Sequence, residues 1–231
     1  MKKLILSLLF IVLAAGTGFC ITVVNSLDGR DVISGAYYAA VKHDQLVFLI
    51  PGENEQLSFD RIGLNGEVFL IQSATHPQIT GMENTLKNRG NKVETLISDD
   101  PLKTNIDLAK RSGAKRFIIV DPVYGYNTIS AMAYAKQNSM YLIFADKDNA
   151  AAVSENLRTI GAEEVLLYGY TDKEVKESLD AKTLQYNEIN LGDKFDDNMQ
   201  ITEMYFKKDP SKKQAILSDG NGIESTIAAG D

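Results

Sequence analysis

The chain has 231 residues, which is room for one large domain or two ordinary ones. Hydrophobic residues make up 44% of the chain and charged residues 24%, a globular balance that excludes a coiled coil, collagen-like repeats and a largely disordered protein. One cysteine excludes an intrachain disulfide, and a net charge of −7 argues against a nucleic-acid-binding protein.

The first 20 residues have the pattern of a secretory signal. Residues 1–3 are a basic start, residues 4–15 an apolar run, and residues 16–18 are small residues before a cleavage point. The run is short for a membrane span, and an uncleaved signal anchor is the alternative. The N-terminal segment therefore engages a membrane or is cleaved, and we expect the protein to be secreted or held at the cell surface.

Strand-like and helix-like segments then alternate along the chain. Apolar runs predict strands at residues 21–24, 46–50, 68–71 and 93–97. Helical spacing and stop signals predict helices at residues 31–43, 55–62, 77–88 and 101–111. This alternation is typical of parallel βαβ units with helices on both faces of the sheet.

The same pattern starts again 96 residues later. Residues 23–39 read VVNSLDGRDVISGAYYA, and residues 119–135 read IVDPVYGYNTISAMAYA. Six of the 17 aligned positions are identical: Val24/Val120, Gly29/Gly125, Ile33/Ile129, Ser34/Ser130, Tyr38/Tyr134 and Ala39/Ala135. The chain therefore contains an internal duplication, which sets its architecture.

The duplication also sets the domain boundaries. After the signal at residues 1–20 we expect a first module at 21–115, a second at 116–214 and the start of a third, incomplete module at 215–231. Because one strand and one helix cannot bury a core alone, the last piece either packs on the second module or begins a unit of a longer chain. The predicted fold class is α/β, with tandem Rossmann-like modules, each a small parallel sheet flanked by helices.

Residues 117–181 contain a strand, a polar loop, an Ala-rich helix, an apolar strand and a helix that ends in IGAEEVLLYG. In this order they resemble the cell wall binding repeat 2 family, and residues 21–114 carry the same elements more loosely. Of the Arg-Tyr-Thr stretch that the family places before a unit, residues 100–105 keep the Thr and residues 196–200 keep nothing. The resemblance implies a secreted, non-catalytic surface protein that binds a cell-envelope polysaccharide or a surface-layer protein.

Three loops that follow the first strand of each module are the candidate binding surface. They are residues 25–30, 121–126 and 219–222, and all three are polar or aromatic. Ligands of parallel α/β sheets commonly bind at the carboxyl ends of the strands. The candidate ligand-binding residues are Asn25, Asp28, Arg30, Asp121, Tyr124, Tyr126, Asp219 and Asn221.

Each of these residue types also has a structural interpretation. Arg30 either grips an anionic polymer or pairs with Asp28. The rings of Tyr124, Tyr126, Tyr168 and Tyr170 either stack on sugars or fill space between loops and helices. We expect Tyr38 and Tyr134 to be core residues.

Residue types at the two helix starts predict backbone geometry. Asp31 and Asn127 are predicted as N-cap residues of the helices that follow the loops. Gly29 and Gly125 are expected to supply a positive φ or a close approach of the helix.

No catalytic constellation is visible in the sequence. Ser34 and Ser130 recur without a recurring histidine, and two histidines with one cysteine give no zinc cluster. We therefore predict no enzyme activity, no cofactor and no metal site. The alternatives are a self-associating surface scaffold, which would be a homo-oligomer, and a soluble-ligand binder or hydrolase on the same modules.

Overall fold

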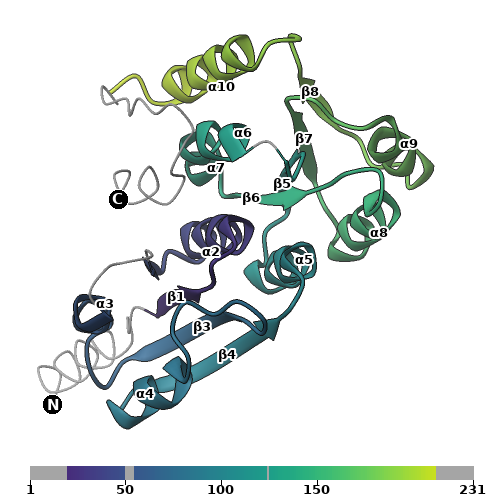
Figure 1. The fold of residues 1–231 in the computed structure, drawn as a ribbon. Helices are drawn as coiled ribbons and strands as arrows, with labels where there is room; N and C mark the ends of the chain where they lie inside the picture. Colours follow the sequence, from purple (N-terminus) through teal and green to yellow (C-terminus); the bar gives the residue numbers. More distant parts are fainter. Residues whose placement is uncertain (1–19, 50–54, 124, 212–231) are drawn as a thin grey trace, which may run out of the picture.

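A computed structural model describes residues 20–49, 55–123 and 125–211. It contains two four-stranded parallel sheets flanked by helices, which confirms the predicted α/β class with Rossmann-like modules (Figure 1). The predicted signal and the predicted third module lie outside the described residues, as do Tyr124, Asp219 and Asn221. Among the described residues, no helix is long and apolar enough to cross a membrane.

The first unit builds its sheet in the order β2-β1-β3-β4. Its elements are β1 (Ile21–Asn25), α2 (Gly29–Lys42), β2 (Gln45–Phe48), α3 (Glu55–Ile62), β3 (Glu67–Ser73), α4 (Met82–Asn88), β4 (Lys92–Ser98) and α5 (Pro101–Ser112). The predicted strands and helices all occur, with one large shift. Helix α4 begins at Met82 instead of residue 77, because Gly81 before it has a φ of 74° and cannot continue a right-handed helix.

The second unit repeats this order as β6-β5-β7-β8, again with every neighbouring pair parallel. Its elements are β5 (Arg116–Val120), α6 (Gly125–Ser130), α7 (Met132–Asn138), β6 (Met140–Phe144), α8 (Ala150–Ile160), β7 (Glu164–Tyr168), α9 (Lys173–Ala181), β8 (Asn187–Ile189) and α10 (Lys194–Lys208). Where the first unit has the single helix α2, the second has the shorter pair α6 and α7.

The core does not stop at the boundary between the units. One apolar cluster covers one face of the first sheet and includes Val23, Leu70 and Leu86. A larger cluster runs from the other face through α2 and α5 into the second sheet, and Tyr38 and Tyr134 belong to it as predicted. Figure 1 shows α2 and α5 between the two sheets. The two units therefore share one continuous hydrophobic core.

Helix α2 approaches strand β1 closely, but not at the glycine that the sequence indicated. A Cβ atom on Gly35 would lie 2.4 Å from Val24 Cγ2, so this position requires glycine. Gly29 is the first residue of α2, its φ is not positive, and no heavy atom lies within 4 Å of where its Cβ would be. Both expectations for Gly29 were therefore wrong, and the close helix approach occurs six residues later, on the face turned toward β1.

The Asn105 side chain hydrogen-bonds α5 to the backbone of the edge strand β6 of the second unit. The fully buried Asn105 accepts a hydrogen bond at Oδ1 from Phe144 N–H (3.0 Å), and its Nδ2 donates to the Leu142 carbonyl oxygen (3.0 Å). The same Nδ2 donates to Ser34 Oγ on α2 (2.9 Å). The amide therefore replaces one peptide group of a neighbouring strand and satisfies the outer edge of β6.

Candidate functional site

The strand order places a switch point in each sheet. From β1 the chain crosses to β2 on one side, and β3 lies on the other side, so the loops after β1 and β3 diverge. In open parallel sheets, ligands bind in the crevice at such a point, outside the carboxyl ends of the strands. We call residues 26–28 with residues 74–81 the first switch point. Residues 121–123 with residues 169–172, after β5 and β7, form the second.

The first switch point is built around the N-terminus of α2. Asp28, and not the predicted Asp31, is the N-cap, and its side chain accepts a hydrogen bond from Arg30 N–H (2.9 Å). Arg30 Nε and Nη2 also donate to the two carboxylate oxygens of Asp28, at 3.0 and 2.7 Å. The cap shifts because α2 begins at Gly29, two residues earlier than the sequence indicated. Arg30 thus pairs with Asp28, which was one of its two predicted roles.

The charge around Arg30 is negative. Asp28, Asp31 and Asp100 all raise the pKa of the Arg30 guanidinium, with the hydrogen bonds of Asp28 as the largest cause. Burial raises the pKa of Asp28, but the hydrogen bonds and charge of Arg30, helped by His76, outweigh it and leave that pKa below its ordinary value. An anion at this point would have to displace a two-point ion pair and approach two further carboxylates.

Asp31 lies inside the first turn of α2 and is buried. Its Oδ2 accepts a hydrogen bond from Ser26 Oγ (2.7 Å). Its other oxygen, Oδ1, is buried without a hydrogen-bond partner, and the Thr104 hydroxyl donates to the Asp100 carbonyl oxygen (3.1 Å). Burial is the largest effect on this carboxyl and raises its pKa. Asp31 therefore holds the loop before the helix through Ser26.

Asn25, which is predicted as a ligand-binding side chain, has a structural role at the end of β1. It is fully buried, accepts a hydrogen bond from Ile79 N–H (2.8 Å) and donates to the Ile79 carbonyl oxygen (2.8 Å). A second donor contact reaches Gln72 Oε1 (3.2 Å). Asn25 thus ties the loop after β3 to the end of β1. Leu27 N–H also donates to the His76 carbonyl oxygen (3.0 Å), which is a second link between the loops after β1 and β3.

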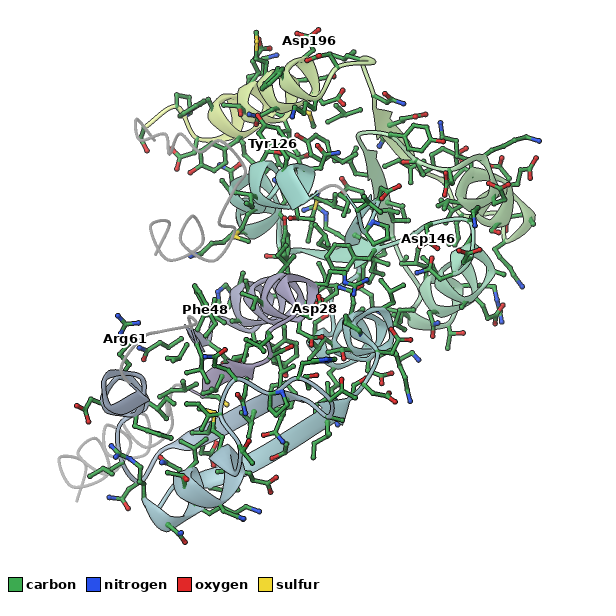
Figure 2. All side chains as sticks on the ribbon, in the orientation of Figure 1. Asp28, Phe48, Arg61, Tyr126, Asp146 and Asp196 are labelled. Carbon is green, nitrogen blue, oxygen red and sulfur yellow. The ribbon has the colours of Figure 1, made fainter. Side chains whose placement is uncertain are left out.

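Two carboxylates, Asp121 and Asp172, lie in the second switch point, and Asp146 lies close enough for its charge to act on Asp121. Asp121 follows β5, Asp146 follows β6, and Asp172 precedes α9. Burial raises the pKa of Asp121, a hydrogen bond from Val123 N–H (2.7 Å) lowers it, and the charges of Asp172 and Asp146 raise it further. Figure 2 shows Asp146 at the end of β6. In the part of the chain that the structure describes, no group of three or more His, Cys, Asp or Glu side chains could hold a metal ion.

Backbone N–H groups organise these carboxylates. Asp146 Oδ1 accepts from Asp148 N–H (2.9 Å) and Asn149 N–H (3.0 Å), and Asp172 Oδ2 accepts from Lys147 N–H (2.9 Å). The pKa of the Tyr170 hydroxyl is raised chiefly by its hydrogen bond to Asp172. The Tyr170 ring is 56% exposed, so this switch point presents an open aromatic face beside acidic groups. An open tyrosine ring with adjacent carboxylates can stack on a sugar and accept its hydroxyl hydrogens.

Tyr126 belongs to a different surface, which it forms with α10. Its hydroxyl accepts a hydrogen bond from Asn198 Nδ2 (2.9 Å), and its ring lies edge-on to Phe195 with centroids 6.0 Å apart. Lys194 Nζ lies 5.3 Å from the Tyr126 ring centroid and 5.1 Å from that of Phe195. Figure 2 shows Tyr126 between α6 and α10, away from Asp28 and Asp146.

Asn127, which is the equivalent of Asp31 in the second unit, and Tyr168 are also buried. Asn127 is the third residue of α6 and not its N-cap, and its amide packs over Gly169 at the end of β7. Tyr168 is fully buried, and its hydroxyl lies 2.7 Å from Ser130 Oγ. Burial, the largest effect, raises the pKa of Tyr168. Of the candidate stacking tyrosines that the structure describes, Tyr170 is open, Tyr126 is half-buried and Tyr168 is not accessible.

The described candidates are not joined to one another by direct contacts. Within residues 20–49, 55–123 and 125–211, no hydrogen bond, ion pair or ring contact joins the loop of Asp28 to the loop of Asp121. Sequence reasoning missed His76, Asp146 and Asp172. These residues belong to no recognisable sequence motif. The strand order of the sheets places them beside the residues that follow β1 and β5.

Comparison with known proteins gives structural neighbours only. No protein-family model matches the chain, and neither does any curated protein sequence. The structure of Cwp6 from Clostridium difficile matches 81% of this chain and 32% of its own length, with a TM-score of 0.62 and 16% identity. Cwp8 from Clostridium difficile matches 90% of this chain and 38% of its own length, with a TM-score of 0.65 and 16% identity. The chain thus spans about a third of these proteins, and it shares their fold.

Proposed function

We propose that this chain is a non-catalytic secreted or surface-attached protein that binds a cell-envelope glycopolymer through the loops at the carboxyl ends of its strands. The signal-like N-terminus, the resemblance to cell wall binding repeat 2 and the fold shared with Cwp6 and Cwp8 support a surface role. The observation that carries the binding proposal is the open Tyr170 ring beside Asp172, Asp121 and Asp146 at the second switch point.

The contacts of Ser34, Ser130 and His76 support the proposal that the protein is not catalytic. Ser34 Oγ donates to the Arg30 carbonyl oxygen (2.7 Å), and Ser130 Oγ contacts Tyr168, so both recurring serines bond inside the protein. His76 Nδ1 lies 2.8 Å from Thr75 Oγ1, while both oxygens of the nearby Asp28 bind Arg30. A serine–histidine–carboxylate relay needs each of these groups to bond the next.

The charges favour a particular class of polymer. The chain has a net charge of −7, and three carboxylates lie in or beside the second switch point with its open ring. A polyanion would be repelled there unless divalent cations bridge the two surfaces. We therefore expect a neutral glycan, or an anionic glycopolymer that is bound only in the presence of bridging cations.

Sedimentation with purified cell-envelope material tests the proposal. The wild-type chain and a Tyr170→Ala variant would be mixed with the envelope at low and high salt, with and without Mg²⁺ or Ca²⁺. We expect the variant to lose roughly 1–3 kcal/mol of binding free energy, as for other exposed aromatic contacts. Leu64→Ala is the matched control, because Leu64 is 61% exposed and lies before β3, at the opposite end of the strands.

Two results count against the proposal. A wild-type chain that stays in the supernatant under every salt and cation condition excludes envelope binding. A Tyr170→Ala variant that sediments as the wild type and Leu64→Ala do leaves the binding but removes the second switch point as its site.

A further inference from the structure

The junction between the two units has two unlike sides. One side is a helical face, made by α2 and α5 of the first unit, and the other is the edge strand β6 of the second. When such a head-to-tail contact occurs once between two repeated units, one more edge strand and one more helical face exist at the outer ends. The outer edge strand is β2, and the outer helical face is made by α6, α7 and α10.

The outer helical face repeats the residue that makes the junction. Asn105 is the fifth residue after Asp100, the N-cap of α5, and Asn198 is the fifth residue after Asp193, the N-cap of α10. Asn105 Nδ2 donates to Ser34 Oγ on the neighbouring helix α2, and Asn198 Nδ2 donates to Tyr126 Oη on the neighbouring helix α6. Asn198 Oδ1 accepts one longer contact, from Thr202 Oγ1 of its own helix (3.4 Å). An asparagine amide carries a second N–H and an oxygen. Asn198 can therefore offer a strand the same donor and acceptor that Asn105 offers β6.

The apolar residues of this face are exposed where those of the junction are packed. At the same register, Leu102 and Ile106 of α5 pack against the shared core. Their counterparts on α10, Phe195 and Met199, are 59% and 63% exposed. Exposed apolar side chains that gather on one face are a sign of a contact with further protein.

The outer edge strand repeats the sequence that the junction binds. Aligned at the 96-residue offset, β2 reads Leu46-Val47-Phe48 where β6 reads Leu142-Ile143-Phe144. Among the described strands, β2 pairs only with β1, as β6 pairs only with β5. The Leu46 carbonyl oxygen and the Phe48 N–H thus correspond to the two groups that Asn105 binds. An unpaired strand edge is a template for association.

We infer that copies of this chain associate head to tail, with edge strand β2 of one copy on the α6–α7–α10 face of the next. Asn198 binds the Leu46 carbonyl oxygen and the Phe48 N–H of the second copy, and Phe195 and Met199 pack beside that strand. The contact is heterologous, so it produces open chains or closed rings and not a symmetric dimer.

Sedimentation velocity over a concentration series tests this association with two variants. Asn198→Asp removes the donor and places a negative charge opposite the Leu46 carbonyl oxygen. Gln45→Lys adds a charge at an exposed position of β2, a change that blocks strand edges in natural sheets. We expect the wild-type chain to form dimers and longer species, and each variant alone to associate at least about tenfold more weakly.

A mixture of the two variants gives the sharpest result. Asn198→Asp keeps an intact β2, and Gln45→Lys keeps an intact helical face, so one complete contact can form between them. We expect an equimolar mixture to form dimers and to stop there. Asn156→Asp on α8 is the control, since its amide donates to the Ala152 carbonyl oxygen of its own helix (2.7 Å), and this variant should associate as the wild type does.

Three outcomes would overturn the inference. They are a wild-type chain that is monomeric at every concentration, variants that each associate as the wild type does, and a mixture that stays monomeric while the wild type associates. The first outcome would assign the α6–α7–α10 face to another occupant, such as a further unit of a longer chain. Neither variant changes Tyr170. Envelope binding by these variants therefore tests the proposed function independently of self-association.

Discussion

Individual residues decide how closely elements approach each other in this protein, and Gly169 is the clearest case. It follows β7 with a φ of 76°, in the left-handed region. A Cβ atom there would lie 2.1 Å from Asn127 Nδ2. Position 169 therefore requires glycine for two reasons, the positive φ and the amide of Asn127 packed against it.

Substitution of this glycine separates the two effects. Gly192 also has a positive φ, of 86°, but no heavy atom lies within 4 Å of its Cβ position. We expect Gly192→Ala to cost roughly 1–2 kcal/mol of unfolding free energy from backbone strain alone. Gly169→Ala should cost a further 1–3 kcal/mol or so, because Asn127 must move. Urea denaturation measures both, and equal losses would show that Asn127 yields freely.

Asp31 predicts a pH dependence of stability. Burial raises its folded pKa above the unfolded value of about 3.9, so the charged carboxylate destabilises the fold at neutral pH. This cost disappears as the pH falls through the folded pKa to the unfolded one. Asp31→Asn reproduces the residue of the second unit, Asn127, and has no charge to lose. Its stability relative to the wild type should therefore be highest at neutral pH and decline toward about pH 4.

Urea midpoints measured across this pH range check the sign. Ser26 can still donate to the asparagine oxygen, so the loop contact is retained in the variant. A difference between variant and wild type that grows as the pH falls would contradict the raised pKa of Asp31.

At the scale of elements, the edge of β6 depends on Asn105. Its loss in Asn105→Ala would leave Phe144 N–H and the Leu142 carbonyl oxygen buried without partners. Each such group costs about 1–3 kcal/mol, so we expect a loss of about 3 kcal/mol or more. Asn156→Ala should change stability by less than about 0.5 kcal/mol, because that amide bonds within its own exposed helix. Thermal or urea unfolding of both variants measures the difference, and similar losses would refute the role of Asn105.

Elements with a local cause were predictable from the sequence. Helix α5 has Asp100 as N-cap, Pro101 at its first position and Gly113 with a positive φ after its end, and its predicted bounds differ by one residue. Helix α2 was misplaced at its start, because its true cap depends on Asp28 turning back toward Arg30. The contact of Asn105 with β6 was not predictable, because it joins residues 37 and 39 positions apart through tertiary packing.

At the scale of the whole molecule, the duplication predicted two like units but not how their sites are composed. The loops after β1 and β5 were found from the sequence, since they recur at a fixed offset. Their partners at each switch point, His76 in one unit and Asp172 in the other, come from the equivalent loops after β3 and β7, whose sequences do not match. The two switch points therefore differ: one holds a closed ion pair, and the other an open tyrosine among carboxylates.

Binding to cell envelopes before and after extraction of their glycopolymers is the most direct test of the proposed function. The wild-type chain would be sedimented with intact envelope and with envelope stripped of its wall polysaccharide, under the same salt and cation conditions. We predict that the chain sediments with the intact envelope and stays in solution with the stripped one. Equal binding to both preparations, or binding to neither, would contradict it.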